Sequence, residues 1–269
     1  MRRFRGFTYI DLIAITILVP LLACATTSWT CWSRQSGGTS NRVKCASNLR
    51  QIGQALLLYA NENRGAYPRT LASATGGQTW GTGTTDDNPF VGTETADDDL
   101  TAAMFLLIRT QDIGSEVFTC PSSNAEKDLY GGGSNGPLQR SNFSTVTKNL
   151  SYSYGHSYPN TTAISKGYKL NSSIGPDFAI AADINPGTAG TGNRVTAVRT
   201  SSSTDDMKGG NSNNHDRDGQ NVLYGDGHVE FQTNPFVGVE RDNIYTTQAG
   251  VIVGSPENGN DSVLLPMDD

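Results

Sequence analysis

Oxygen-bearing side chains cluster around a short turn late in the chain, in a pattern that could hold a hard cation. Asp216, Asp218 and Gln220 alternate along the chain, and Asp226 follows on the next turn. Calcium prefers six to eight such oxygen ligands. The stretch lacks the twelve-residue EF-hand spacing and its bidentate glutamate, so an ordinary Asp/Gly turn closed by side-chain-to-backbone hydrogen bonds is the alternative. No cofactor is required by the sequence, and calcium is the ligand that this stretch could take.

Histidines are the next candidates for chemistry. The chain has three histidines, His156, His215 and His228. Together with Asp183 or Asp226 they could form a zinc or iron site. Neither an HExxH motif nor a His-x-His pair is present. We therefore expect His215 to anchor a loop through hydrogen bonds and His228 to face across a hairpin.

A serine nucleophile is the remaining catalytic possibility. Residues 155–159 imitate a nucleophile elbow, but the final glycine and the following helix are missing. The glycine-rich stretches lack the lysine of a phosphate-binding loop. The sequence therefore predicts a protein that is not an enzyme.

Four cysteines could form disulfides or remain free thiols. Cys24 and Cys31 lie in or beside an apolar segment, whereas Cys45 and Cys120 lie in the polar remainder of the chain. A Cys45–Cys120 bridge is permitted if that remainder is outside the cytoplasm, and two buried free thiols are the alternative. Without a CxxC pair, zinc-ribbon and thioredoxin-like proteins are excluded.

Composition narrows the function classes further. The chain has 269 residues, a net charge of −6, 36% hydrophobic residues and 30 glycines. This length suffices for a buried core, and the glycine content predicts many loops. Nothing in the sequence makes a basic surface, so nucleic acid is not an expected partner.

The N-terminal segment predicts a single membrane crossing. Residues 1–6 contain three arginines and no acid, and residues 7–32 carry one charge, Asp11. An apolar stretch of about 20 residues is long enough to cross a bilayer. Because the basic end stays inside, we expect a single-pass inner-membrane protein with a cytoplasmic N-terminus and a periplasmic or extracellular head.

Residues 6–12, Gly-Phe-Thr-Tyr-Ile-Asp-Leu, resemble the prepilin cleavage site of type IV pilins and type II secretion pseudopilins. The resemblance implies that a prepilin peptidase cuts between Gly6 and Phe7, that residues 1–6 are a leader, and that Phe7 is then methylated. It also implies that Asp11 takes the place of the usual glutamate, which pairs with the terminal amine of a neighbouring subunit. Like subunits in a pseudopilus or pilus would then be the partners, and the protein would be a structural subunit.

Two other interpretations of the same segment remain open. Residues 23–25, Ala-Cys-Ala, could be a signal-peptidase site. Residues 21–24, Leu-Leu-Ala-Cys, resemble a lipobox, which would place a lipid on Cys24. The protein would then be a membrane-anchored binding module that does not polymerise.

Hydrophobic periodicity predicts an α+β head over residues 41–269, with helices packed on a small antiparallel sheet and long loops between them. Residues 33–40 form a polar linker or a melted helical turn. Helices are expected over residues 41–63 and 99–112, and strands over 117–121, 151–158 and 178–184. Residues 221–224 and 228–231 flank Gly-Asp-Gly and predict a hairpin. A long membrane helix followed by this head is a pilin-like order of elements.

Two blocks carry a second resemblance, residues 44–68 and 214–231. Together they are similar to the large prepilin-like family of planctomycetes and their relatives, whose members have a prepilin-type start and a C-terminal histidine, spacer, Asp-Gly element. Here that element is His215, a ten-residue spacer, and Asp226-Gly227. The resemblance implies placement and architecture, and it implies no reaction.

Overall fold

Five short antiparallel strands form one sheet within residues 41–269. Across the sheet their order is β4-β3-β2-β1-β5, and every neighbouring pair is antiparallel. The strands are β1 Tyr152–Gly155, β2 Ala179–Asp183, β3 Gln220–Tyr224, β4 Val229–Gln232 and β5 Leu264–Leu265. The α+β class and the antiparallel sheet expected from the sequence are confirmed.

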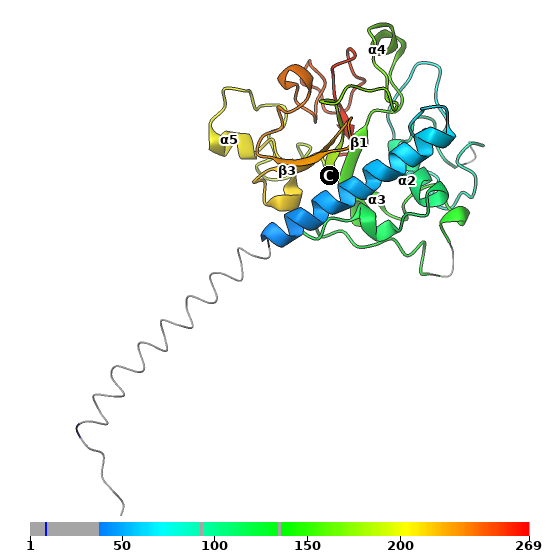
Figure 1. Cartoon of the computed structure of the whole chain (residues 1–269), viewed down its shortest axis with the longest axis horizontal. Helices are drawn as coiled ribbons and strands as arrows, with labels where there is room; N and C mark the ends of the chain where they lie inside the picture. Colours follow the sequence, from blue (N-terminus) through cyan, green and yellow to red (C-terminus); the bar gives the residue numbers. More distant parts are fainter. Residues whose placement is uncertain (1–8, 10–37, 92–93, 134–135, 269) are drawn as a thin grey trace, which may run out of the picture. The chain divides into compact units, whose positions relative to one another are not determined.

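The computed structural model describes residue 9 and residues 38–91, 94–133 and 136–268 (Figure 1). The chain divides into two units, residues 1–40 and 41–269, and the second unit, the head, contains the whole sheet. Gly6, Phe7 and Asp11 lie outside the described residues, as does all of the expected membrane segment except Tyr9. Within the described ranges, no helix has both the length and the apolar character needed to cross a bilayer.

One face of the sheet is covered by a long amphipathic helix, shown in blue in Figure 1. Residues 38–62 are helical, so residues 38–40 of the expected linker are part of the helix. Leu49, Ile52 and Leu56 recur at helical spacing and are buried in one cluster with Ile180 and Leu223 of the sheet. The hydrophobic period that predicted the helix therefore also marks the face that packs on the sheet.

The opposite face of the sheet is covered by long connections together with Leu100 and Ala103. Its apolar cluster contains Val222 and Leu264 from the strands and Val195, Ile244 and Tyr245 from the long connections. Residues of β3 alternate between the two clusters, as the period of two along a strand requires. Because the sheet has apolar residues on both faces, the long connections are needed to shield the second face from water.

Short helices complete the head. Asp99 accepts a hydrogen bond from the Ala102 backbone and caps the start of α2, close to the expected start. The described helices after residue 62 are α2 Leu100–Thr110, η1 Ser115–Phe118, η2 Pro137–Gln139, α3 Val146–Asn149, α4 Thr161–Ser165, α5 Thr204–Lys208, η3 Asn213–His215 and η4 Val239–Arg241.

Two strand predictions need correction. Residues 115–118 form the 3₁₀ helix η1 where a strand was expected over 117–121. The Phe118 and Thr119 carbonyls accept from Ser151 N and the Asn48 side chain, so these contacts replace a sheet ladder. Strand β1 ends at Gly155, three residues before the expected end, and the hydroxyl of Tyr158 bonds to Thr70.

Candidate functional site around the Cys45–Cys120 disulfide

A disulfide joins the long helix to the loop that follows η1. Cys45 and Cys120 lie 75 residues apart in sequence, and their Cα atoms are 5.1 Å apart. Both cysteines are fully buried within the cluster between helix and sheet. The bridge therefore ties the start of this helix to the segment beside β1 and β2.

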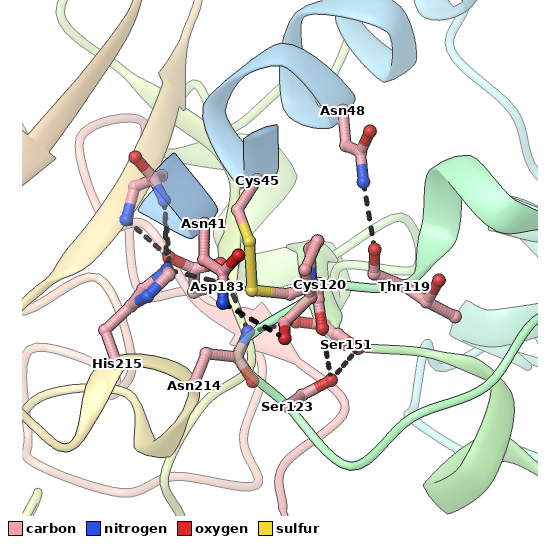
Figure 2. The surroundings of a disulfide bond; sticks show 12 residues. Asn41, Cys45, Asn48, Thr119, Cys120, Ser123, Ser151, Asp183, Asn214 and His215 are labelled. Carbon is pink, nitrogen blue, oxygen red and sulfur yellow. Dashed lines mark hydrogen bonds and ion pairs between the residues drawn. A yellow bond between two sulfur atoms is a disulfide. The ribbon is translucent and has the colours of Figure 1, made fainter. Parts of the chain in front are cut away.

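A buried carboxylate and a buried imidazole lie beside this disulfide (Figure 2). Asp183 is the last residue of β2, and His215 ends the short helix η3. The Nε2 atom of His215 lies 3.2 Å from Oδ2 of Asp183, and the two side chains are 2% and 0% exposed. Asp216 follows with a positive φ of 55°, which turns the chain sharply after the histidine.

Asp183 is held in place by amide donors from two asparagines. Its Oδ2 accepts from the Asn221 backbone at 2.6 Å and from Nδ2 of the same residue at 3.0 Å. Its Oδ1 accepts from Nδ2 of Asn214 at 3.1 Å, and that amide also donates to the Ser151 carbonyl. A fully buried carboxylate needs such donors, because burying an unpaired charge costs several kcal/mol.

The four side chains converge on one small volume. Nε2 of His215 lies 3.8 Å from Sγ of Cys120. The ligand atoms of Cys45, Cys120, Asp183 and His215 all lie within 4.8 Å of one another, and all four residues are buried. Two sulfurs, one imidazole nitrogen and one carboxylate oxygen are a donor set typical of zinc, although the disulfide occupies both sulfurs here.

A cavity of about 440 Å³ lies next to this cluster. Ser123, Ser151 and Asn214 are among its lining residues. The two serine hydroxyls hydrogen-bond at 2.8 Å, and Ser123 also donates to the Cys120 carbonyl. Because Asn214 both lines the cavity and bonds to Asp183, the cavity ends one side chain away from the cluster.

The expected calcium ligands do not come together. Asp218 precedes β3 and pairs with Arg42 at 2.8 Å and Lys208 at 3.4 Å, whereas Asp226 follows β3. A five-residue strand separates its ends by roughly 13 Å. Gln220, at the start of that strand, uses its amide on the backbone of Ser212 and Asn234. These side chains therefore do not form one site, and Asp216 lies at the same distant end of β3 as Asp218.

The Asp226-Gly227 part of the expected element forms the β3–β4 turn. Oδ1 of Asp226 accepts from the His228 backbone, and Nδ1 of His228 contacts the same oxygen on the surface. These hydrogen bonds, the backbone one first, lower the pKa of Asp226. His228 stacks on Tyr224 with 4.5 Å between ring centroids, and Gly227 takes a φ of 88°. Such a turn needs no ligand to be stable.

The histidines occupy three different surroundings. His156 is buried near Gln78, whose Oε1 lies 3.2 Å from its Nε2, and burial lowers the pKa of His156 to about 4. His228 lies on the exposed turn, and His215 lies in the buried cluster. The three therefore do not share a metal site, and the residues that accompany His215 are Asp183 and the two cysteines.

Sequence reasoning identified all four residues of the cluster as candidates, but it did not predict that they lie together. It did not identify Asn214 and Asn221 as the residues that hold Asp183. One signal was available: Asp183 ends an apolar strand, where a carboxylate needs several donors. Asn214, which precedes His215, and Asn221, near the start of β3, are such donors.

Comparison with protein-family models, with curated proteins and with solved structures finds no match to this chain.

Proposed function

We propose that this chain is a non-enzymatic, prepilin-like structural subunit of a type II secretion or type IV pilus-like assembly. The observation that carries the proposal is the long amphipathic helix that lies on an antiparallel sheet and is bridged by Cys45–Cys120 to the loop that follows η1. This order of elements matches the architecture implied by the prepilin-like N-terminus.

The disulfide supports an exported head. Disulfides persist in oxidising compartments and are rare in the reducing cytoplasm. The basic residues 1–6 and the apolar residues 7–32 supply the expected orientation, with the N-terminus inside and the head in the periplasm or outside the cell. The chain is then inserted in the inner membrane before any assembly into a filament.

The proposal assigns roles to the leader, residues 1–6, and to the apolar segment, residues 7–32. A prepilin peptidase removes residues 1–6 after Gly6, and Phe7 becomes the methylated N-terminus. The apolar helix then packs with its copies, and Asp11 neutralises the terminal amine of a neighbouring subunit. An acid within a bilayer helix costs about 2.5–3.5 kcal/mol unless it has a partner, and this amine is the proposed one.

Mass spectrometry of the mature N-terminus tests the proposal. The full chain is produced in a host that has a prepilin peptidase and is purified from membranes. We expect a methylated peptide that begins at Phe7, and we expect Gly6→Val to retain residues 1–6. Cys24→Ser is the matched control and should be processed normally. A lipid-modified peptide beginning at Cys24 would instead favour a membrane-anchored binding module that does not polymerise.

A further inference from the structure

We propose that Cys45, Cys120, His215 and Asp183 form a zinc site when the disulfide is reduced. The same two sulfurs then have two alternative states: a covalent bridge in the oxidised head and two metal ligands in the reduced head. This inference does not depend on filament formation.

Two of the donor separations match those of a tetrahedral zinc ion. Zinc lies about 2.3 Å from thiolate sulfur and about 2.0–2.2 Å from imidazole nitrogen or carboxylate oxygen, so neighbouring ligand atoms lie roughly 3.3–3.8 Å apart. The distance from His215 Nε2 to Asp183 Oδ2 is 3.2 Å, and the distance from Nε2 to Cys120 Sγ is 3.8 Å. These donors are therefore already near tetrahedral spacing.

Nε2 of His215 faces the other members of the cluster. Nδ2 of Asn221 lies 3.2 Å from Nε2 of His215. Nε2 therefore contacts an amide nitrogen, a carboxylate oxygen and a cysteine sulfur, and it is the ring nitrogen that would bind a metal in this cluster. A cation between Nε2 and Oδ2 of Asp183 would be coordinated by both atoms.

A second layer of contacts is also present. Asn221 donates to Asp183 through both its backbone and its side chain, and Asn214 donates to the other carboxylate oxygen. Ligating carboxylates are commonly held by such outer hydrogen bonds, and their loss weakens metal binding about 10–100-fold. Full burial of all four ligands would exclude competing water from the ion.

Conversion of the disulfide into two metal ligands requires one external reductant. An external dithiol donates two electrons and two protons to the Cys45–Cys120 bond, yielding two thiols and an oxidised, disulfide form of the reductant. Zinc then displaces the two thiol protons and binds two thiolates. The neighbouring cavity, which reaches Asn214, gives small molecules an approach to within one side chain of the cluster.

The test uses the full chain in detergent, with Cys24→Ser and Cys31→Ser so that only the head cysteines remain. Reduced and oxidised samples are incubated with zinc alone and then passed over a desalting column. We expect one zinc per reduced chain and none per oxidised chain. Cobalt in place of zinc should give a sulfur-to-cobalt charge-transfer band only in the reduced sample.

Single substitutions assign the ligands. In the reduced chain, His215→Ala and Asp183→Asn should lose zinc on the column, and Asn221→Ala should weaken binding about 10–100-fold. The matched control is His228→Ala, because that imidazole lies on the exposed β3–β4 turn and should leave zinc binding unchanged.

X-ray absorption of zinc in the reduced chain without ligand substitutions provides a measurement that does not depend on whether the variants fold. The expected shell has two sulfurs and two nitrogen or oxygen atoms. A reduced chain without zinc, whether folded or not, would overturn the proposal. So would a shell of other composition, or a His215→Ala variant that folds and keeps zinc as tightly as the parent.

Discussion

The carboxylate of Asp183 and the imidazole of His215 meet at 3.2 Å in the interior of the head, beside a disulfide and withdrawn from solvent. They come from the end of β2 and the turn before β3, 32 residues apart in sequence by their numbers. Buried polar pairs of this kind are costly to build, and leaving one member unpaired is costlier still. The stability of the head should therefore depend on both residues.

Asp183→Asn should destabilise the oxidised head by about 3 kcal/mol. The new amide cannot accept from the Asn221 backbone, the Asn221 side chain and Asn214 as the two carboxylate oxygens do. Urea unfolding of the full chain in detergent, followed by circular dichroism, measures the change. His228→Ala on the exposed turn is the control and should cost no more than about 1 kcal/mol, since it loses only exposed contacts with Tyr224 and Asp226. A near-neutral Asp183→Asn would show that the network around the carboxylate contributes little.

Loss of the disulfide should cost more than loss of any single hydrogen bond. The Cys45→Ala, Cys120→Ala double variant releases a loop of 75 residues, which the chain-entropy treatment values at about 4 kcal/mol. Unfolding is measured in the presence of a chelator, so that metal binding does not contribute. The Cys24→Ser, Cys31→Ser variant is the control, and its head should unfold at the same denaturant concentration as the parent. Equal midpoints for both variants would contradict the assignment of the bridge to Cys45 and Cys120.

Local patterns in the sequence were sufficient for the large elements but not for the site. Helical spacing of Leu49, Ile52 and Leu56 predicted the helix, and the Gly-Asp-Gly turn predicted the hairpin, because both signals are local. Strand β5 has only two residues and carries no pattern of its own. The cluster was not predictable in this way, because Cys45, Cys120, Asp183 and His215 come from four distant segments. Their meeting depends on strand order, which no local period encodes.

The expected calcium ligands show the opposite error: they are neighbours in sequence but lie apart in the structure. Asp216, Asp218, Gln220 and Asp226 are close in sequence, and closeness in sequence suggested one site. Strand β3 lies between Asp218 and Asp226 and carries them apart. The ten-residue spacer between His215 and Asp226 thus contains a turn and one whole strand. An extended segment separates residues that a helix or loop would have brought together.

Gly53 should be required where the long helix packs against Leu223 of the sheet. A Cβ atom at this position would lie 2.9 Å from Cδ1 of Leu223, a buried residue of β3. Gly53→Val should therefore destabilise the head by about 1–3 kcal/mol. Gln54→Val, on the exposed side of the same turn, should cost only a few tenths of a kcal/mol.

A double-mutant cycle separates the contact from general effects on the helix. In a Leu223→Ala background, the penalty of Gly53→Val should shrink, because the added methyls gain space. Thermal or urea unfolding of the four proteins gives the coupling free energy. A penalty that is the same in both backgrounds would mean that the contact with Leu223 is not its cause.

Buried acids should make the head less stable as the pH rises through neutrality. Burial, together with the nearby Asp261 carboxylate, raises the pKa of Asp242 to about 8, and burial raises that of Asp261 to about 6. Since the folded head then binds more protons than the unfolded chain above pH 4, its stability falls as pH rises toward 8. The fall between pH 5 and 8 is on the order of 3 kcal/mol.

His156 contributes in the opposite direction at lower pH. Burial lowers its pKa to about 4, so its contribution is complete above about pH 6.5 and is lost as the pH falls toward 4. The free energy of unfolding should therefore be largest at mildly acidic pH. Asp242→Asn should flatten the decline above pH 6 and leave the acid limb in place. A decline that persists unchanged in Asp242→Asn would assign it to other groups.

Asp11 should control association between copies of the chain rather than insertion of one copy. It is the one charged residue in residues 7–32, and its proposed partner is the terminal amine of a neighbouring subunit. We expect Asp11→Ala to reach the membrane normally, because removal of the charge lowers the cost of insertion. Two differently tagged copies of Asp11→Ala should co-purify less than two copies of the parent. Asp11→Glu keeps the charge and adds one methylene of reach, so its copies should associate at least as well as the parent. If Asp11→Ala copies associate as strongly as the parent, then the carboxylate does not pair subunits and the amine has another partner.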